Sequence, residues 1–537
     1  MQAYVEPFTD DEVAVLSRFF TNVDRPVFAL INMPEVVKGA LFARYSRSAK
    51  SLRRLFLDEF VADPDAGIDA IVGGAEPGLD IDRAERLYQR VFVEYGDDSV
   101  AQLGAAHLAV EQGSNLLTKA LEWGRLAAYL EQSTRYIPYD TRLGDRHRYV
   151  IPPEIQESPL RRRYVSWVGS LFDAYAELLS GMKEYYERRF PLPDGESPRP
   201  WAVSLRAKAF DAVRGVLPAA TSSNVGVFAS GQAWEMALVR MRAHPLAEVR
   251  HCADAMLVEL RRVIPSFLRR VDVPDRGEAW TAYLADVRDR LDDIAAGLSD
   301  PDLEPGPSVA LVGWDEDAET KVAAAALYPG STLPDQYLLE TVAAMTQAER
   351  AAVLAAAVGE RANRRHKPGR AFERALYRFD IICDFGAFRD LQRHRMMTIE
   401  WQRLGSRLGH DTPPDILEAG MEGLWSGVME NACEIHHETE AALGADVAQY
   451  VLPLAFNIRF VMEMNAREAM HLIELRSQPA GHRAYRQVAL EMHRAIEQVA
   501  GHRLIAGAMK YVDGSDVELE RLEGERRAEQ RRHALGA

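Results

Sequence analysis

The sequence predicts a helix-rich α+β protein that consists of two tandem copies of one domain. Apolar residues recur at helical spacing through most of the chain, and a set of sequence landmarks occurs twice in the same order. With 537 residues, the chain is also longer than a single hydrophobic core usually allows.

The composition, with 47% hydrophobic and 27% charged residues, is typical of a globular protein. A net charge of -16 argues against nucleic acid or an anionic membrane as the partner. Because we find neither a membrane-length apolar run nor a signal-peptide pattern, we expect a cytoplasmic protein. Cys252, Cys383 and Cys433 are isolated and lack CxxC spacing, so the sequence predicts neither a disulfide framework nor a zinc site.

The first half of the chain is predicted to be mostly helical. Thr9 and Glu12 form a capping box, which indicates a helix start. Helical periodicity continues through 35–61 and 82–95, and Gly96-Asp97-Asp98-Ser99 then begins a long helix over about 99–122. Further helices are predicted at 160–190, 233–242 and 246–262.

The second half begins after 297–308, a segment rich in proline and acidic residues that we interpret as a linker. A short strand is predicted at 309–314, and Thr346 with Glu349 caps an alanine-rich helix. A long helix is expected to end at Arg393. Later helices are predicted at 465–476 and from about 482. The predicted organisation is therefore a repeat at 1–296, the linker 297–308, a repeat at 309–513 and a charged tail at 514–537.

Both halves contain three landmarks in the same order, which indicates a diverged duplication. The landmarks are a helix ending in a basic or aromatic-basic triplet, a Val-Leu-Pro motif and a helix ending in arginine. They occur at Trp123-Gly124-Arg125, 216–218 and Arg242 in the first half, and at Arg393-His394-Arg395, 451–453 and Arg476 in the second. Two guanidinium groups around a histidine at a helix end could bind a pyrophosphate in a bidentate way. The alternatives are an ordinary solvated basic turn and, for His394, a buried core histidine.

These landmarks resemble the flavin-dependent thymidylate synthases. The signature of that family is Arg-His-Arg followed by a serine, usually continuing to Arg-Tyr. An arginine before Val-Leu-Pro, an Asn-Ala-Arg triplet and a Leu-x-x-Leu-Arg motif follow it. The resemblance covers about 35–260 and 309–510, and neither half keeps the whole pattern.

The C-terminal half keeps the motifs that contact flavin in the family. By this resemblance, the flavin-binding residues are Arg393, His394, Arg395, Asn465 and Arg467, and Arg476 faces the uracil ring of dUMP. Three positions depart from the pattern: Arg403 replaces the signature serine, Gly405-Ser406 replaces Arg-Tyr, and Gln449 replaces the arginine before Val-Leu-Pro.

The N-terminal half keeps the complementary, nucleotide-binding motifs. The resemblance implies that the nucleotide is held by Glu131, Ser133, Arg135 and Arg214, with Arg242 near its ring. The alternative for Ser133 and Arg135 is a capped turn before Pro138. Ser99 matches a helix start at which a hydroxyl approaches the flavin. Trp123-Gly124 and Gly231-Gln232-Ala233 stand where Arg-His and Asn-Ala-Arg are expected.

The resemblance implies an FAD-dependent thymidylate synthase, which methylates C5 of dUMP to give dTMP with methylenetetrahydrofolate, a flavin hydride and NADPH. We expect the C-terminal copy to supply the flavin side and the N-terminal copy the phosphate side. Arg476 or Arg242 would stabilise charge that develops on the uracil ring. The alternative for each is a surface arginine at a helix end.

Two other enzyme features are not favoured by the sequence. Cys383 lies in an apolar run that indicates packed core, so attack by a cysteine thiolate on the ring has little support. His436-His437 is interpreted as a solvated helix face without a third metal ligand.

Family members are homotetramers with shared active sites, so we expect two tandem chains to pair as a pseudo-tetramer. Two other functions stay open because both copies have lost motif residues. One is a catalytically silent flavin- or nucleotide-binding paralogue, and the other is a C5-methylase of a different pyrimidine nucleotide.

Overall fold

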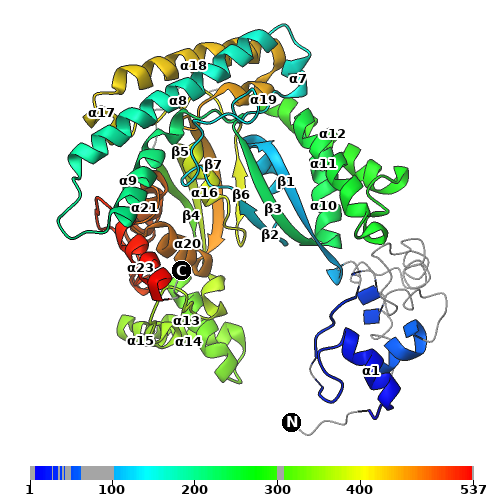
Figure 1. Ribbon diagram of the computed structural model, residues 1–537. Helices are drawn as coiled ribbons and strands as arrows, with labels where there is room; N and C mark the ends of the chain where they lie inside the picture. The colour runs from blue at the N-terminus through cyan, green and yellow to red at the C-terminus, as the bar shows by residue number, and fades with distance from the viewer. Residues whose placement is uncertain are drawn as a thin grey trace. The chain divides into compact units, whose positions relative to one another are not determined.

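The computed structural model describes residues 6–26, 28–33, 35, 37–38, 41–42, 50–61, 102–298 and 307–534. The chain forms two compact units (Figure 1). Unit 1 comprises Met1–Glu111, Leu126–Glu131 and Asn224–Ser299, and unit 2 comprises Gln112–Arg125, Gln132–Ser223 and Asp300–Ala537. A large part of the first predicted repeat therefore packs with the second repeat inside unit 2.

Unit 1 contains a three-stranded sheet in the order β1-β3-β2. Strand β2 runs antiparallel to β3, with Ala127 opposite Ala229 and Glu131 opposite Val225. The elements of this unit are α1 (Asp10–Phe19), α3 (Leu52–Leu55), η1 (Phe56–Val61), β1 (Ala105–Ser114), β2 (Ala127–Glu131), β3 (Ser222–Ser230), α10 (Gly231–Arg242), α11 (Ala247–Arg261), η5 (Pro265–Leu268), η6 (Pro274–Glu278) and α12 (Ala279–Ala296).

Unit 2 contains a four-stranded sheet in the order β4-β5-β7-β6. Its strands are antiparallel, and buried and partly exposed residues alternate along β7, so one face of that strand packs on the core. The strands are β4 (Val309–Trp314), β5 (Leu376–Asp384), β6 (Thr398–Trp401) and β7 (Asn457–Asn465).

Helices surround this sheet, and α8 lies beside α18 at the top of Figure 1. The helices of unit 2 are α6 (Asn115–Leu121), α7 (Pro153–Gln156), α8 (Arg161–Arg189), α9 (Pro198–Val213), η4 (Arg214–Val216), α13 (Ala318–Leu327), η7 (Tyr328–Gly330), α14 (Asp335–Ala344), α15 (Gln347–Val358), η8 (Arg370–Arg374), α16 (Phe385–Leu391), α17 (Pro414–Glu418), α18 (Glu422–Leu443), α19 (Ala445–Ala448), η9 (Gln449–Val451), α20 (Ala466–Arg476), α21 (Arg483–Gln498), α22 (Arg503–Ala508) and α23 (Leu522–Ala534).

The duplication predicted from the landmarks is visible in the order of elements. The strand order β1-β3-β2 in one sheet matches β5-β7-β6 in the other. In both sheets a short polar side chain ends the strand and caps the next helix: Ser114 before α6, Asp384 before α16, Ser230 before α10 and Asn465 before α20. The two copies therefore share a fold as well as motifs.

The two Val-Leu-Pro motifs pair with each other inside unit 2. The Ala219 N–H donates to the Leu452 carbonyl at 2.8 Å, and the Leu454 N–H donates to the Leu217 carbonyl at 2.9 Å. Exchanging the two motifs converts one bond into the other, which is the reciprocity expected at a two-fold contact. A pseudo-two-fold axis therefore passes between Pro218 and Pro453, which form a β-bridge.

Several predicted elements are confirmed by the structure. The capping boxes at Thr9 and Thr346 are both present. Helices α8 and α11 and strand β4 match the predicted segments closely, and α21 begins at Arg483. The predicted helix at 82–95 lies outside the described residues, as does most of the linker, so the domain boundaries stay predictions.

The predictions of two long helices were wrong. Where the spacing predicts a helix over 99–122, the described part forms β1 and the seven-residue helix α6. The predicted helix ending at Arg393 is instead β5 followed by α16. Both errors have the same cause: a buried strand that runs directly into a capped helix keeps apolar residues at short intervals, and only pairing with a distant strand decides between the two structures.

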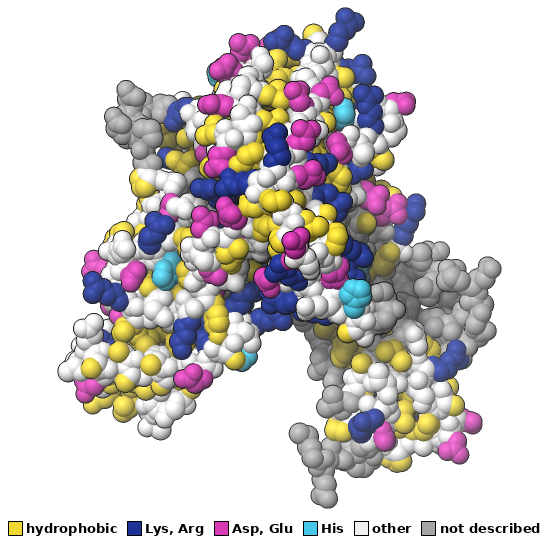
Figure 2. Space-filling view, turned by 60° about the vertical axis from the view of Figure 1, so that its left-hand side comes forward, with side chains coloured by type: hydrophobic (Ala, Val, Ile, Leu, Met, Phe, Trp, Pro, Cys, Tyr) yellow, Lys and Arg dark blue, Asp and Glu magenta, His cyan; other side chains and the backbone are white. Residues whose placement is uncertain are grey.

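Charged side chains of both signs are mixed on the face drawn in Figure 2. On the face drawn in Figure 2, acidic and basic side chains are interspersed among the described residues, so the net charge of -16 does not form one large field there. Within the described residues, no helix has the length and apolarity that crossing a bilayer requires. The His436 side chain is buried, so a solvated face is wrong for it, whereas His437 is exposed.

Candidate functional site

Arginines from both predicted repeats meet around one buried carboxylate, Asp390, on α16. The carboxylate lies 3.4 Å from Arg214 Nη1, 3.7 Å from Arg393 Nη1 and 3.9 Å from Arg476 Nη1. Although burial raises the pKa of Asp390, the surrounding guanidinium groups, with Arg135 as a fourth, hold that pKa well below its usual range. Asp390 is therefore ionised and is the common counter-charge of the cluster.

Arg214 lies against α16 beside Gly386, where an added Cβ would crowd the Asp384 carboxylate and only touch Arg214. A Cβ at Gly386 would lie 2.9 Å from Asp384 Oδ1 and 3.4 Å from Arg214 Nη2. Arg214 is 4% exposed, and its Nε and Nη2 have no hydrogen-bond partner in the part of the chain that the structure describes. Burial raises the pKa of the neighbouring Asp384 to about 6, despite Arg214. A buried guanidinium thus keeps two donor nitrogens available.

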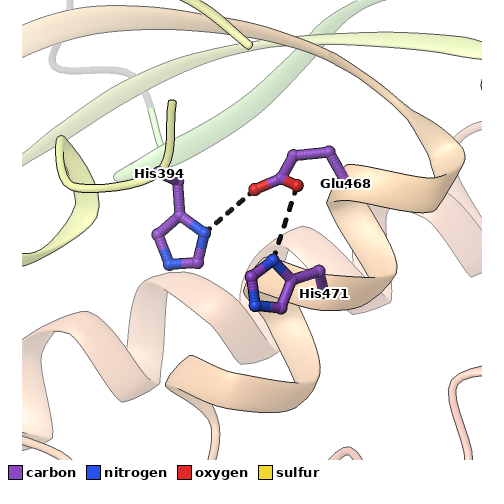
Figure 3. Close-up of side chains that lie close together, drawn as sticks. All are labelled: His394, Glu468 and His471. Carbon is purple, nitrogen blue, oxygen red and sulfur yellow. Dashed lines mark hydrogen bonds and ion pairs between the residues drawn. The ribbon is translucent and has the colours of Figure 1, made fainter. Parts of the chain in front are cut away.

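Arg476, the last residue of α20, is held by a chain of side chains that runs back to Glu468. Arg476 Nε donates to His394 Nε2 at 3.0 Å, and His394 Nδ1 lies 3.0 Å from a Glu468 carboxylate oxygen. Figure 3 shows Glu468 between His394 and His471, with one oxygen directed to each ring. The guanidinium of Arg476 also donates to the Asp390 carbonyl. These contacts fix the orientation of the Arg476 side chain.

His394 must be neutral to accept the bond from Arg476. With Nδ1–H donating to Glu468, the lone pair on Nε2 faces the Arg476 N–H. Burial and the charge on Arg476 together lower the pKa of His394 to about 4, although the bond to Glu468 opposes them. Both histidines donate hydrogen bonds to Glu468. These bonds lower the pKa of its carboxyl to about 2, although burial raises it. His394 is thus a buried histidine, as the alternative interpretation of the sequence predicted.

The same three side chains could be considered as metal ligands, because His394, Glu468 and His471 offer atoms within 4.8 Å of one another. Metal binding at His394 Nδ1 would move the ring proton to Nε2, where it would face the Arg476 N–H. The hydrogen bond that holds Arg476 would then be lost. The group consequently fits the orientation of an arginine better than the binding of a cation.

Arg135 is bound at both ends of its guanidinium. Its Nε and Nη2 donate to the two carboxylate oxygens of Asp211 at 2.8 and 2.7 Å, and its Nη1 donates to the Tyr485 hydroxyl at 2.7 Å. The Tyr485 ring lies 5.6 Å from the Arg135 guanidinium carbon and 5.3 Å from that of Arg476. One buried tyrosine thus contacts the predicted phosphate arginine and the predicted ring arginine.

A cavity of about 730 Å³ lies beside this cluster. Its lining includes Asp211, Arg214 and Asp384 together with His482. His482 Nε2–H donates to the Asp211 carbonyl at 3.2 Å, and burial with the nearby Arg214 charge lowers its pKa to about 3. The cavity is large enough for a small organic ligand, and polar groups from both predicted repeats line it.

The two basic triplets of the repeats also meet inside unit 2. Trp123 is 44% exposed, packs edge-on against Trp401 at 6.1 Å, and donates from Nε1 to the Ile399 carbonyl at 3.4 Å. Arg395 Nη1 donates to the Arg125 carbonyl at 3.5 Å. Aromatic and guanidinium surfaces thus lie next to one another on the edge of the cluster.

Other predicted site residues lie in more ordinary surroundings. Arg242 belongs to unit 1, where it donates to Asp254 at 2.9 Å and to the Val271 carbonyl at 3.2 Å. Asn465 caps α20, and Arg467 donates to the Pro368 carbonyl at 2.9 Å.

Three further predicted residues stand at the N-terminal repeat. The Ser133 hydroxyl accepts a bond from the Arg135 N–H at 3.2 Å, and Glu131 is a buried residue at the end of β2 in unit 1. Ser99 lies outside the described residues.

The sequence analysis missed the carboxylates and the tyrosine that organise the cluster. Asp390 stands three residues before Arg393, so its position in the same helical turn was an available signal. Asp211 and Tyr485 are far in sequence from their partner Arg135, and no local pattern marks them.

The three thiols do not offer a nucleophile. Burial raises the pKa of Cys383 well above its usual value, raises that of Cys252 to about 12, and also raises that of Cys433. Cys383 is buried, as predicted for packed core. A thiolate addition to a pyrimidine ring has no support in these environments.

Comparison with known proteins also indicates that the two halves of the chain are related. The family described as thymidylate synthase complementing protein matches residues 49–266 and 310–501. A UPF0159 protein of Chlamydia muridarum is 39% identical over 525 residues, which are 97% of this chain and 98% of the relative. A UPF0159 protein of Thermoplasma acidophilum is 30% identical over 514 residues, covering 91% of this chain and 97% of the relative.

A flavin-dependent thymidylate synthase of Mycobacterium marinum matches a shorter part. It is 30% identical over 204 residues, which are 37% of this chain and 75% of that protein. The family matches both halves, and the strand order β1-β3-β2 of one sheet recurs as β5-β7-β6 in the other. The chain therefore belongs to the thymidylate synthase complementing protein family and contains the family domain twice.

Proposed function

We propose that this protein is an FAD-dependent enzyme of the thymidylate synthase type that methylates C5 of dUMP. Methylenetetrahydrofolate would supply the carbon, and NADPH would be the reductant. The observation that carries the proposal is the meeting of Arg135 and Arg214, from one repeat, with Arg393 and Arg476, from the other, around Asp390. Such a cluster suits a substrate that has a phosphate at one end and an acidic ring at the other.

In this proposal each arginine has a distinct task. Arg135 and Arg214 hold the phosphate, and Arg214 has two buried donor nitrogens to offer. Arg476 faces the pyrimidine, where its fixed charge stabilises negative charge that develops on the ring. His394 and Glu468 act as positioning residues, because they fix the Arg476 side chain before the substrate arrives.

The residues on the edge of the cluster fit a flavin. Arg393 is exposed and Arg395 is partly exposed, so their guanidinium groups can reach a pyrophosphate. Trp123 presents an exposed aromatic ring beside Arg125 and could stack on a planar ring system. Reduced FAD bound there would supply the hydride. His394 is turned inward, so we assign it to Arg476 and not to the flavin.

The first test is whether the purified protein binds flavin and whether dUMP accelerates oxidation of the reduced flavin when methylenetetrahydrofolate is present. Arg476→Ala should abolish the dUMP-dependent rate and keep flavin binding. Arg494→Ala, on the exposed face of α21, is the control and should behave as wild type. Failure of wild-type protein to bind flavin, or failure to rescue a thymidine auxotroph at full expression, would count against the proposal.

A second candidate, a silent nucleotide- or flavin-binding paralogue, is favoured by one specific observation. Asp211, Asp390 and the Tyr485 hydroxyl already bind the arginines that a nucleotide would need. If these groups cannot move aside, the protein would hold flavin without turnover. Crystals or spectra with bound flavin but no change on adding dUMP would support this candidate. Reaction with another pyrimidine nucleotide is the remaining alternative, and a nucleotide screen in the same assay covers it.

The assembly and location follow from the same proposal. We propose a homodimer of tandem chains, which would place four family domains in one assembly, with no nucleic-acid or membrane partner. Light scattering of the purified protein tests the dimer, and cell fractionation tests the cytoplasmic location.

A further inference from the structure

The chain continues past the second family match, which ends at residue 501, and part of this continuation reaches the candidate site. Helix α23 lies alongside α9, as Figure 1 shows in red and green-blue. Ser197 Oγ donates to Glu529 at 3.0 Å, and Arg526 forms an ion pair with Glu196. The tail of the second repeat is thus attached to a helix of the first.

Arg521, just before α23, extends from this attachment to the carboxylate that holds Arg135. Its Nη2 donates to Asp211 Oδ2 at 2.6 Å, and its Nη1 donates to the Arg135 carbonyl at 3.4 Å. Its guanidinium carbon lies 5.0 Å from the centre of the Tyr136 ring. Arg521 is 8% exposed, so its charge is buried beside the half-buried Arg135 and Asp211.

The contact changes the charge balance at the predicted phosphate end. Asp211 carries one negative charge, and both Arg135 and Arg521 bind it. The adjacent His482 is neutral at physiological pH, because burial and Arg214 lower its pKa to about 3. Arg135 and Asp211 alone would form a neutral pair with no net attraction for an anion. Arg521 adds a second positive charge to this pair, and the nearby carboxylate of Glu520 has its own cation in Lys208, 3.7 Å away.

We propose that Arg521 is a positioning residue for the phosphate of the nucleotide and lies outside the segments that carry the family motifs. By sharing the Asp211 carboxylate, it helps to fix Arg135 and leaves that arginine less completely neutralised, so that it can attract a phosphomonoester. This inference rests on the proposed nucleotide function. The competing explanation is that Arg521 only fastens the tail, as Arg526 does through Glu196.

The test compares dUMP with deoxyuridine, which lacks the phosphate, in binding to the full chain. Arg521→Ala should weaken dUMP binding about tenfold to a hundredfold, the range expected for losing a hydrogen bond to a charged group. Deoxyuridine binding, flavin content and kcat should stay unchanged, and the effect should appear in KM. Arg521→Lys keeps the charge and should recover most of the dUMP affinity. Arg527→Ala, an exposed arginine on the same helix, is the matched control.

Three results would overturn the inference. Arg521→Ala could bind dUMP as tightly as wild type, or it could lose dUMP and deoxyuridine equally, which indicates a purely structural role. In wild-type protein, dUMP should slow hydrogen exchange in 518–524, and unchanged exchange despite dUMP binding would be the third; this measurement needs no variant to fold. If wild type binds no dUMP at all, the proposed function fails first and this inference with it.

Discussion

Replacing Asp390 with asparagine tests whether one carboxylate holds the arginine cluster together. The substitution keeps the size of the side chain and removes its charge. At the observed separations of 3.4–3.9 Å, an effective dielectric constant of about 20 gives each Arg–Asp pair an attraction of roughly 4–5 kcal/mol. Desolvation offsets much of this, so we expect a net destabilisation of about 3–5 kcal/mol, the range measured for breaking buried ion pairs.

Hydrogen exchange of α16 and α20 is a suitable assay, because it reports local stability and does not require the two units to unfold together. A loss of about 3 kcal/mol should make the slowest amides exchange at least roughly 100-fold faster. The control is Asp446→Asn, which breaks the exposed pair with Arg403 and should cost less than about 1 kcal/mol.

The direction of the pH dependence adds a second check. The Asp390 pKa is depressed in the folded protein, so its stabilising contribution is complete above the unfolded pKa of about 4 and is lost only as pH falls further. The difference between wild type and Asp390→Asn should therefore stay constant from pH 8 to about 5. If the exchange rates of the two proteins agree within about threefold at pH 7, the cluster does not depend on this carboxylate and the reasoning is refuted.

Three further predictions concern neighbouring groups. The pKa of His394 is lowered to about 4, so its contribution to the free energy of unfolding, about 3 kcal/mol, should be complete above pH 6.5 and decline toward pH 4. If urea titrations show a difference in stability between wild type and His394→Asn that does not change with pH, this prediction is contradicted. Gly386→Ala should displace the Asp384 carboxylate that caps α16 and cost about 1–3 kcal/mol by thermal unfolding, whereas Gly427→Ala, with open space around its Cβ, should not. Cys383 should resist alkylation in the native protein and react after unfolding, as mass spectrometry would show.

The sequence predicted those parts of the fold whose signals are local. A capping box depends only on residues that are close in sequence, so the starts of α1 and α15 were predicted correctly. Strands β1 and β5 were assigned to helices because a strand is stabilised by partners that are distant in the chain. Each of these strands leads directly into a short helix, so their apolar spacing resembled one longer helix.

In the candidate site, too, only residues with a local sequence signal could be predicted. Arg135, Arg214 and Arg476 were named as candidates because each stands in a motif. The structure places Arg214 and Arg476 at 3.4 and 3.9 Å from Asp390, and Arg135 reaches the cluster through Tyr485. Tyr485, which contacts two of them, has no motif and could be found only once α21 was placed. Motifs identify residues that many related proteins share, whereas the contacts that neutralise their charges depend on this particular fold.

The reciprocal hydrogen bonds between the two Val-Leu-Pro motifs have an evolutionary consequence. When two identical chains associate, every substitution appears on both sides of the axis. A residue therefore cannot change on one side without the same change at the equivalent position on the other. A covalent duplicate escapes this constraint, because each side is encoded separately. One linker also keeps the two sides together at any dilution. Arg-His-Arg can thus persist on one side while Trp-Gly-Arg takes its place on the other, and neither loss needs to be matched.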